Sequence, residues 1–223
     1  MVPLGTNSAV AHVHQDTVVS ALHGVEVVAD PTNALALEAA RRRSALLRDH
    51  PRSTELVRLA TSIRVVRAQR FGPGALAHFQ LLALVTAGRD TGHQAFEQKA
   101  AVEHLRIGVD ACRATGATHV RLALTDLTTG RFSAVATRVA QAFAGDPGVT
   151  VGSWPDRPGG RGYYAGFCCK IYATYDGVTF EVGDGGMVDW TQQLLANRKE
   201  RLFTSGLGLD RMAAPPEVPD RDL

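Results

Sequence analysis

Apolar residues recur along this chain with two kinds of spacing, one typical of strands and one typical of helices. Apolar residues at helical spacing predict helices at residues 34–48, 90–115, 132–143 and 189–199. Helices and strands alternate, so the fold class that we expect is α/β, in the mixed α+β sense. Runs rich in β-branched or aromatic residues predict the strands, at residues 25–29, 62–66, 80–87, 119–124, 163–173, 178–182 and 202–205.

Glycine-rich stretches punctuate the last third of the chain. Asp176-Gly177 lies between two strand runs and predicts a hairpin, because both residues tolerate positive φ. Residues 183–186 (GDGG) predict a tight turn or a close approach of the backbone to a ligand. Residues 146–160 are rich in Gly and Pro without a regular pattern, and we expect a loop there, beside the site.

Composition limits the class of protein. The 223 residues suffice for one sizeable domain, and a net charge of +2 is too small to imply a nucleic-acid partner. The three cysteines give no disulfide framework, and no apolar run predicts a membrane span or a signal peptide, so we expect the reducing cytoplasm. We divide the chain into an N-terminal segment (1–24) that frays at its start, a core domain (25–212) and a flexible tail (213–223).

Some polar residues have an ordinary structural interpretation. We interpret the arginines at 41–43 as the solvated face of a helix, with a nucleic-acid contact as the alternative. Neighbouring residues of a strand point to opposite faces, so Cys168 and Cys169 should diverge and cannot share a metal. The same rule predicts that Tyr163 and Tyr164 diverge, one lining a pocket while the other packs in the core.

An ordered set of motifs fills residues 163–211: YYAG, then F-E-V, then GG-x-x-D, then GLGLDR. This order resembles the end of a class II aminoacyl-tRNA synthetase catalytic domain. The nearest branch is histidyl-tRNA synthetase with its paralogue, the regulatory subunit of ATP phosphoribosyltransferase. The resemblance covers roughly residues 25–211. It implies a mixed, mainly antiparallel sheet flanked by helices, and a homodimer. We expect the family's inserted tRNA-contacting domain to be absent or vestigial here, and its anticodon-binding domain to be missing.

The resemblance implies ATP and Mg²⁺ as cofactors, with the metal bridging the phosphates. Two strands joined by a loop at residues 71–74 are similar to the family's second motif, whose arginine grips the α-phosphate. That role falls to Arg64, and Phe79 would stack near the adenine. Arg211 would hold the γ-phosphate, with Gly206 and Gly208 beside the nucleotide. Arginine suits these roles because its planar fork matches phosphate oxygens.

The resemblance also implies a pocket for an amino acid or a related small carboxylate. The strand–DPT–helix order at residues 25–48 is similar to the family's pocket segment, in which an acidic residue and a threonine take part. The residues that the resemblance assigns to this pocket are Thr32, Gln80, Tyr163, Tyr164, Gly185, Gly186 and Asp189.

The sequence departs from the family pattern in several places. Val66 stands where the second motif has a glutamate, and Gly159 stands where an arginine assists adenylate formation, with Arg161 two residues away. Leu81 and Val85 replace a glutamine and an acidic residue that hold the ammonium group of histidine. An apolar lining cannot compensate a buried ammonium group, so a histidine-specific pocket is not expected.

These observations leave three hypotheses. The first is an adenylate-forming enzyme that passes its acyl group to a carrier, a small acceptor or a tRNA acceptor end. The second is a non-catalytic regulatory subunit that senses an amino acid or a nucleotide and acts through a partner enzyme. The third is an α/β protein whose glycines serve only as turns. The two arginines at 64 and 211 favour the first, and the departures favour the second.

Overall fold

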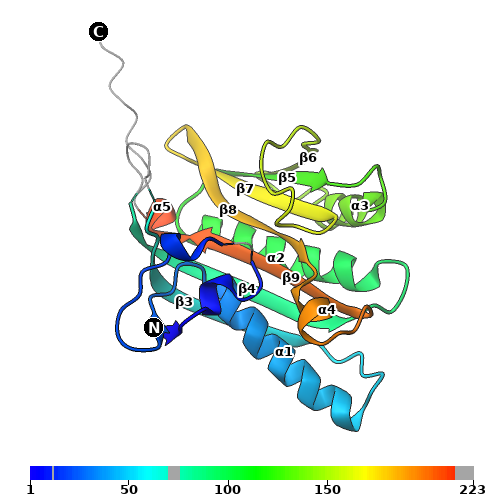
Figure 1. Cartoon of the computed structure of the whole chain (residues 1–223). Coiled ribbons are helices and arrows are strands. Elements are labelled where there is room, and N and C mark those ends of the chain that lie inside the picture. Colours follow the sequence, from blue (N-terminus) through cyan, green and yellow to red (C-terminus); the bar gives the residue numbers. More distant parts are fainter. Residues whose placement is uncertain (12, 70–75, 214–223) are drawn as a thin grey trace.

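The structure is a computed structural model that describes residues 1–11, 13–69 and 76–213 (Figure 1). Seven strands form one sheet in the order β3-β4-β9-β8-β7-β5-β6. All neighbours are antiparallel except β5 and β6, which are parallel. The mixed, mainly antiparallel sheet is therefore confirmed. The strands are β3 (Val57–Val66), β4 (His78–Arg89), β5 (His119–Asp126), β6 (Val149–Ser153), β7 (Phe167–Tyr175), β8 (Val178–Val188) and β9 (Glu200–Gly208).

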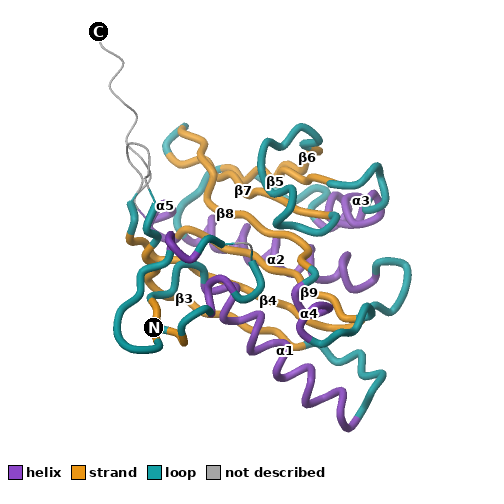
Figure 2. Tube along the Cα trace, viewed as in Figure 1, coloured by secondary structure: helices purple, strands orange, loops and turns teal. Residues whose placement is uncertain are grey.

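Helices cover both faces of this sheet (Figures 1 and 2). The front face is the one that carries α1 (Pro31–Asp49), α4 (Trp190–Leu194) and the N-terminal segment. The back face carries α2 (Ala95–Ala114) and α3 (Ser133–Ala142), which bury the largest apolar cluster. The short helix α5 (Leu209–Ala213) follows β9 directly. Each strand residue can therefore be assigned to a face by alternation.

Helix α1 begins at a cap that the sequence encodes. The Asp30 carboxylate accepts hydrogen bonds from the Thr32 backbone N–H (2.9 Å) and hydroxyl (2.7 Å), and Pro31 is the first helical residue. Proline is tolerated there because its missing N–H would have no partner in the helix. This cap fixes Asp30 and Thr32 at the front face.

The arginines of α1 do not all face solvent. Arg41 and Arg42 bind Glu38 on the exposed side, as the solvated-face interpretation predicts. Arg43 is 0% exposed and forms a bidentate pair with Glu200 of β9, at 2.8 and 2.9 Å. It also donates to two backbone carbonyls of the loop after α1. The solvated-face interpretation was therefore wrong for Arg43, because its partner lies far away in the sequence.

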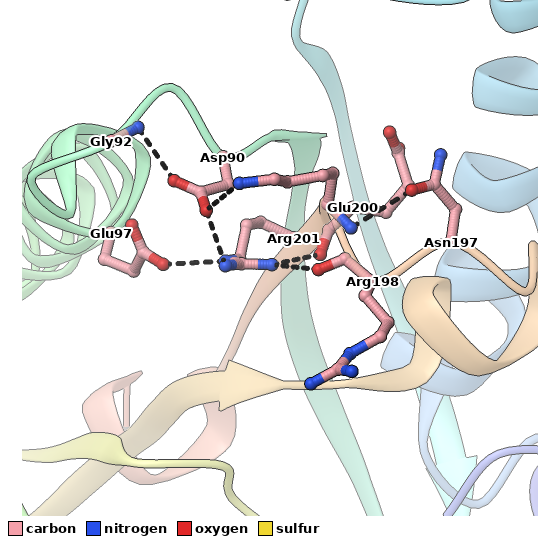
Figure 3. A network of polar contacts seen from close by, with 8 residues as sticks. Asp90, Gly92, Glu97, Asn197, Arg198, Glu200 and Arg201 are labelled. Carbon is pink, nitrogen blue, oxygen red and sulfur yellow. Dashed lines mark hydrogen bonds and ion pairs between the residues drawn. The ribbon is translucent and has the colours of Figure 1, made fainter.

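A second polar network ties β9 to the turn before α2 (Figure 3). Arg201 donates to Glu97 at 2.9 Å and to Asp90 at 3.0 Å, and it also holds two backbone carbonyls. Asp90 in turn accepts from the backbone N–H of Gly92 and lies 3.4 Å from the Lys199 ammonium group. The start of β9 is thus held on its back side as well.

The glycines at residues 183–186 do not end β8, contrary to the tight turn that the sequence predicted. Residues 183–186 continue the strand to Val188 instead of turning. The hairpin at Asp176-Gly177 is confirmed, with φ of 48° and 80°. Strand β6 lies within the stretch predicted to be a loop, and α4 is shorter than predicted, since Ala196 adopts a φ of 48°.

The N-terminal segment packs onto the front face rather than fraying at its start. Strands β1 (Val2–Pro3) and β2 (Val25–Glu26) pair, and two 3₁₀ turns lie between them, at Thr6–Ser8 and Gln15–Thr17. The buried Asn7 side chain donates to Glu26 and accepts from the backbone N–H of Ala29 at 2.9 Å. The predicted loop at 71–74 and nearly all of the predicted tail lie outside the described residues.

A buried histidine joins α2 to the back of the sheet. The two ring nitrogens of His104 lie 2.9 Å from the Thr86 hydroxyl and 2.8 Å from the Ser205 hydroxyl. Burial lowers the pKa of His104 to about 4. The unfolded chain, with a histidine pKa near 6.5, therefore binds a proton that the folded protein excludes between pH 6.5 and about 4.

We expect the free energy of unfolding to fall as the pH drops from 6.5 towards 4, because His104 protonates only in the unfolded chain. Urea unfolding at pH 7 and at pH 5, on the wild type and on His104→Asn, measures this. The variant should be less stable at pH 7 and show a shallower loss between the two pH values. Equal slopes for both proteins would contradict the assignment.

The Arg43–Glu200 pair gives a second prediction. Arg43→Met leaves Glu200 buried without its cation and should cost about 3–5 kcal/mol of unfolding free energy. Replacing both residues by Met should cost less than the sum of the two single changes, because no uncompensated charge remains. A double-mutant cycle in urea measures this coupling, and additive costs would show that the pair is not a unit.

Candidate functional site

A cation and an aromatic ring meet at the front face beyond β3. The Arg67 guanidinium lies 5.2 Å from the centre of the Phe79 ring, and its Nε donates to the Ala29 carbonyl at 3.0 Å. The backbone N–H of Arg67 donates to the Ala77 carbonyl and extends the β3–β4 hairpin. Phe79, predicted to stack on adenine, thus lies at the front face, with Arg67 as its cationic neighbour.

Arg64 and Gln80 lie on the other side of the sheet. They are ladder partners, and their neighbour Val65 is buried at the front face, so alternation turns both towards the back. The Arg64 guanidinium lies 3.6 Å from the Asp210 carboxylate, which also accepts from the Gln80 backbone N–H at 2.9 Å. The structure therefore does not bring Arg64 or Gln80 to Phe79 and Arg67.

The sequence around Arg67 also carries part of the family's second motif. Gln69 stands two residues after Arg67, in the spacing of the family's arginine and glutamate, with an amide in place of the carboxylate. An odd separation of three residues puts Arg64 and Arg67 on opposite faces. The ring of Phe79 identifies Arg67 as the one at the front.

Gly206 and Gly208 form a bare floor on the front face of β9. A Cβ at Gly206 would meet only the Leu81 side chain, at 3.6 Å, and one at Gly208 would meet its nearest atoms at 3.8–3.9 Å. Neither residue has the positive φ that requires glycine. Arg211 borders this floor and donates to the Glu181 carbonyl at 3.2 Å. The fold itself therefore does not require glycine at these two positions.

The two glycines predicted for the carboxylate pocket have a packing role instead. A Cβ at Gly185 would lie 2.8 Å from the Thr204 carbonyl, and Gly185 pairs with Ser205 on the back side. A Cβ at Gly186 would lie 2.6 Å from the Phe167 carbonyl and 2.7 Å from the Tyr164 ring. Gly186 thus lets Tyr164 settle on the front face.

Both tyrosines of the YYAG motif face the front, contrary to the alternation prediction. They follow a turn, where both backbone N–H groups donate to the Gly160 carbonyl, and their rings pack edge to face at 4.8 Å. The Tyr163 hydroxyl donates to the Asp30 carboxylate at 3.4 Å, and burial raises the pKa of Tyr163. Tyr163, Asp30 and the buried Thr32 therefore form one wall of the site.

Asp189 lies at the far end of this wall. It precedes α4, and its carboxylate accepts from the Gln193 side chain at 2.8 Å. With Tyr163, Trp190 and nearby chain segments it lines a cavity of about 30 Å³. This volume suits a single water molecule rather than an amino acid.

Arg157 is the site residue that the sequence reading missed. It is 5% exposed, and its Nη2 donates to the Asp184 carboxylate at 2.5 Å. Its guanidinium lies 5.5 Å from the centre of the Tyr164 ring. Arg161, by contrast, is exposed. The only hint in the sequence was an arginine six residues before the tyrosines, because its partner Asp184 belongs to a distant strand.

The described residues contain no group of three or more His, Cys, Asp or Glu side chains that could hold a metal ion. Cys168 and Cys169 diverge as predicted, with Cys169 in the back-face core, and both are free thiols with raised pKa values. None of the helices within the described ranges is long and apolar enough to cross a membrane.

No family model matches the sequence, and no curated protein matches it. Solved structures do match. Apo histidyl-tRNA synthetase of S. aureus has a TM-score of 0.63 at 15% identity, covering 87% of this chain and 53% of that one. An ATP phosphoribosyltransferase regulatory subunit/histidyl-tRNA synthetase from Bacillus halodurans has a TM-score of 0.66 at 14% identity, covering 95% and 71%.

The RNA binding domain of threonyl-tRNA synthetase from Cryptosporidium parvum has a TM-score of 0.64 at 11% identity, covering 94% of this chain and 55% of that one. The chain thus spans about half the length of the S. aureus and C. parvum proteins. Identities this low establish the fold and leave the activity open. The resemblance drawn from the YYAG to GLGLDR motifs is confirmed at that level, and the fold is class II synthetase-like.

Proposed function

We propose that this chain activates an amino acid or a related carboxylate with ATP. A carboxylate oxygen of the substrate attacks the α-phosphorus, the bond to the β-phosphate oxygen breaks, and an acyl-adenylate and pyrophosphate form. The observation that carries the proposal is the bare floor at Gly206 and Gly208, which the fold does not require. A flat surface bordered by Phe79 and two arginines suits a nucleotide.

The roles of the arginines follow from where their side chains lie. We give the α-phosphate role to Arg67 in place of Arg64, because Arg67 shares the front face with Phe79. Arg211, next to Gly208, keeps the γ-phosphate role expected from the sequence. Catalysis here depends on placing positive charge where negative charge develops on the phosphates. Mg²⁺ would arrive on the phosphate oxygens of ATP and neutralise part of their charge.

The part of the site around Arg157 suits the carboxylate substrate. Arg157 places a buried cation beside Tyr164, between the glycine floor and the wall formed by Asp30, Thr32 and Tyr163. We assign to Arg157 the assisting role that the resemblance expected at position 159. The acyl acceptor would be a carrier, a small molecule or a tRNA acceptor end, in a homodimer as the motif resemblance implies.

A regulatory role is the second candidate. Arg157 already has a carboxylate partner in Asp184, and Val66 and Gln69 leave no glutamate near Arg67. A protein with these departures would bind the ligands, without turnover, and act through a partner enzyme. The similar B. halodurans structure is that of an ATP phosphoribosyltransferase regulatory subunit/histidyl-tRNA synthetase.

Gly208→Val tests the nucleotide floor. The added Cβ would meet its nearest atoms at 3.8–3.9 Å, so we expect little change in stability and at least a tenfold loss of ATP binding by calorimetry, because the side chain occupies the place of the nucleotide. Gly183→Ala is the matched control. Its Cβ would lie 2.7 Å from the Leu207 side chain, so stability should fall. If Gly208→Val binds ATP with the wild-type affinity, the hypothesis that the nucleotide lies on the floor at Gly206 and Gly208 is refuted.

ATP–pyrophosphate exchange, with each of the twenty amino acids in turn, tests the reaction. Arg67→Ala should lower exchange roughly 100-fold, through lost charge stabilisation. Arg64→Ala, on the opposite face, should stay within roughly threefold of the wild type, because it removes only a half-exposed pair with Asp210. A larger loss in Arg64→Ala would return the phosphate role to that residue. If neither the amino acids nor simple carboxylates support exchange, adenylate formation is refuted and the regulatory role remains as the candidate function.

A further inference from the structure

A row of small side chains crosses the front face and ends at a carboxylate. Ala83 of β4 pairs with Gly206 of β9, and Gly206 pairs with Asp184 of β8. All three point to the front, because their neighbours Leu82 and Leu207 belong to the back-face cluster. A ligand that lies on Ala83 and Gly206 therefore has Asp184 at one end.

The two oxygens of Asp184 differ in their partners. Oδ2 accepts from Arg157 at 2.5 Å, while Oδ1 is buried and has no hydrogen-bond partner among the described residues. Burial raises the pKa of Asp184. A buried carboxylate oxygen without a donor costs free energy, so a missing donor is the natural complement of Oδ1.

The chain does not supply that donor from the nearest candidates. Lys170 is the ladder neighbour of Asp184, but its ammonium group pairs with Glu181 at 2.5 Å. The other carboxylates described on this face have partners: Asp30 accepts from Thr32 and Tyr163, Asp189 accepts from Gln193, and Glu200 binds Arg43. Among these four acids, Asp184 is the one with a buried oxygen that lacks a donor within the described residues.

The β4 side of the floor cannot serve an ammonium group. Leu81 and Val85, the front-face neighbours of Ala83 along the strand, are both buried and apolar. An ammonium group placed against them would lose its water without gaining an acceptor. A charged amine on this floor therefore has to face β8, where Asp184 stands.

We propose that Asp184 is the substrate-binding residue that accepts a hydrogen bond from a primary ammonium group, so that the ligand is an amino acid rather than a simple carboxylate. This inference rests on the site of the proposed function and narrows its substrate class. Because Oδ1 is shielded in this structure, the proposal requires the loop that carries Arg157 to shift when the ligand binds. The ligand carboxylate then lies towards the nucleotide floor.

Calorimetric titration with each of the twenty amino acids, without ATP, tests this assignment on the full chain. For the amino acid that binds, Asp184→Asn should weaken the affinity roughly 10- to 100-fold, since a hydrogen bond to a charged group is lost. Asp176→Asn, which removes an exposed carboxylate from the turn between β7 and β8, should stay within roughly threefold. Asp184→Glu, which keeps the charge, should bind better than Asp184→Asn, and urea unfolding verifies that each variant is folded.

The desamino analogue of the same ligand, with hydrogen in place of the amine, provides the second measurement. It should bind the wild type weakly and lose nothing further in Asp184→Asn. Equal binding of amino acid and analogue to the wild type, unchanged amino-acid affinity in Asp184→Asn, or no binding by any amino acid would overturn the assignment.

The two proposals fail separately. ATP–pyrophosphate exchange that a simple carboxylate supports would uphold the adenylate-forming activity and refute the ammonium site at Asp184. Amino-acid binding that depends on Asp184, without any ATP–pyrophosphate exchange, would uphold the ammonium site and refute the adenylate-forming activity.

Discussion

The buried ion pair between Arg43 and Glu200 sets the spacing on which the site depends. It joins the middle of α1 to the first residue of β9, and both side chains are 0% exposed. The N-terminus of α1 carries Asp30 and Thr32, while the other end of β9 carries the glycine floor. Because a buried charge cannot lose its partner cheaply, the wall and the floor are held at a fixed separation.

Arg201, the next residue of β9, binds partners on the opposite face of the sheet. Glu200 points to the front and binds α1, whereas Arg201 points to the back and binds Asp90 and Glu97 around the start of α2. Two successive residues thus fasten one strand to the layers on both sides of the sheet. A β9 held in this way gives the floor a rigid support, which a site that works by placing charges requires.

The sequence predicted the features that depend on neighbouring residues. The alternation of strands and helices and the hairpin at Asp176-Gly177 are both local patterns, and the structure has them. The shared motifs also predicted the fold class. The continued strand at 183–186 escaped prediction, because glycine permits a turn but does not impose one.

Residues whose place depends on distant partners could not be predicted. Arg43 and Glu200 are 157 positions apart, and Arg157 and Asp184 belong to a loop and to a strand that the sequence does not pair. For Arg64 and Arg67 the missing information was the phase of one strand, which only the buried neighbour Val65 and the ring of Phe79 reveal. Such side chains make up most of the candidate site.

The strand order has a consequence for biosynthesis. β9 follows the other strands among the described residues, yet it lies between β4 and β8. Without β9 the strand order falls into two parts, β3-β4 and β8-β7-β5-β6, each with an open edge where β9 pairs in the folded protein. Unpaired edges invite pairing with other chains, so we expect the nascent protein to be prone to aggregation until β9 has emerged and paired. The same event completes the glycine floor.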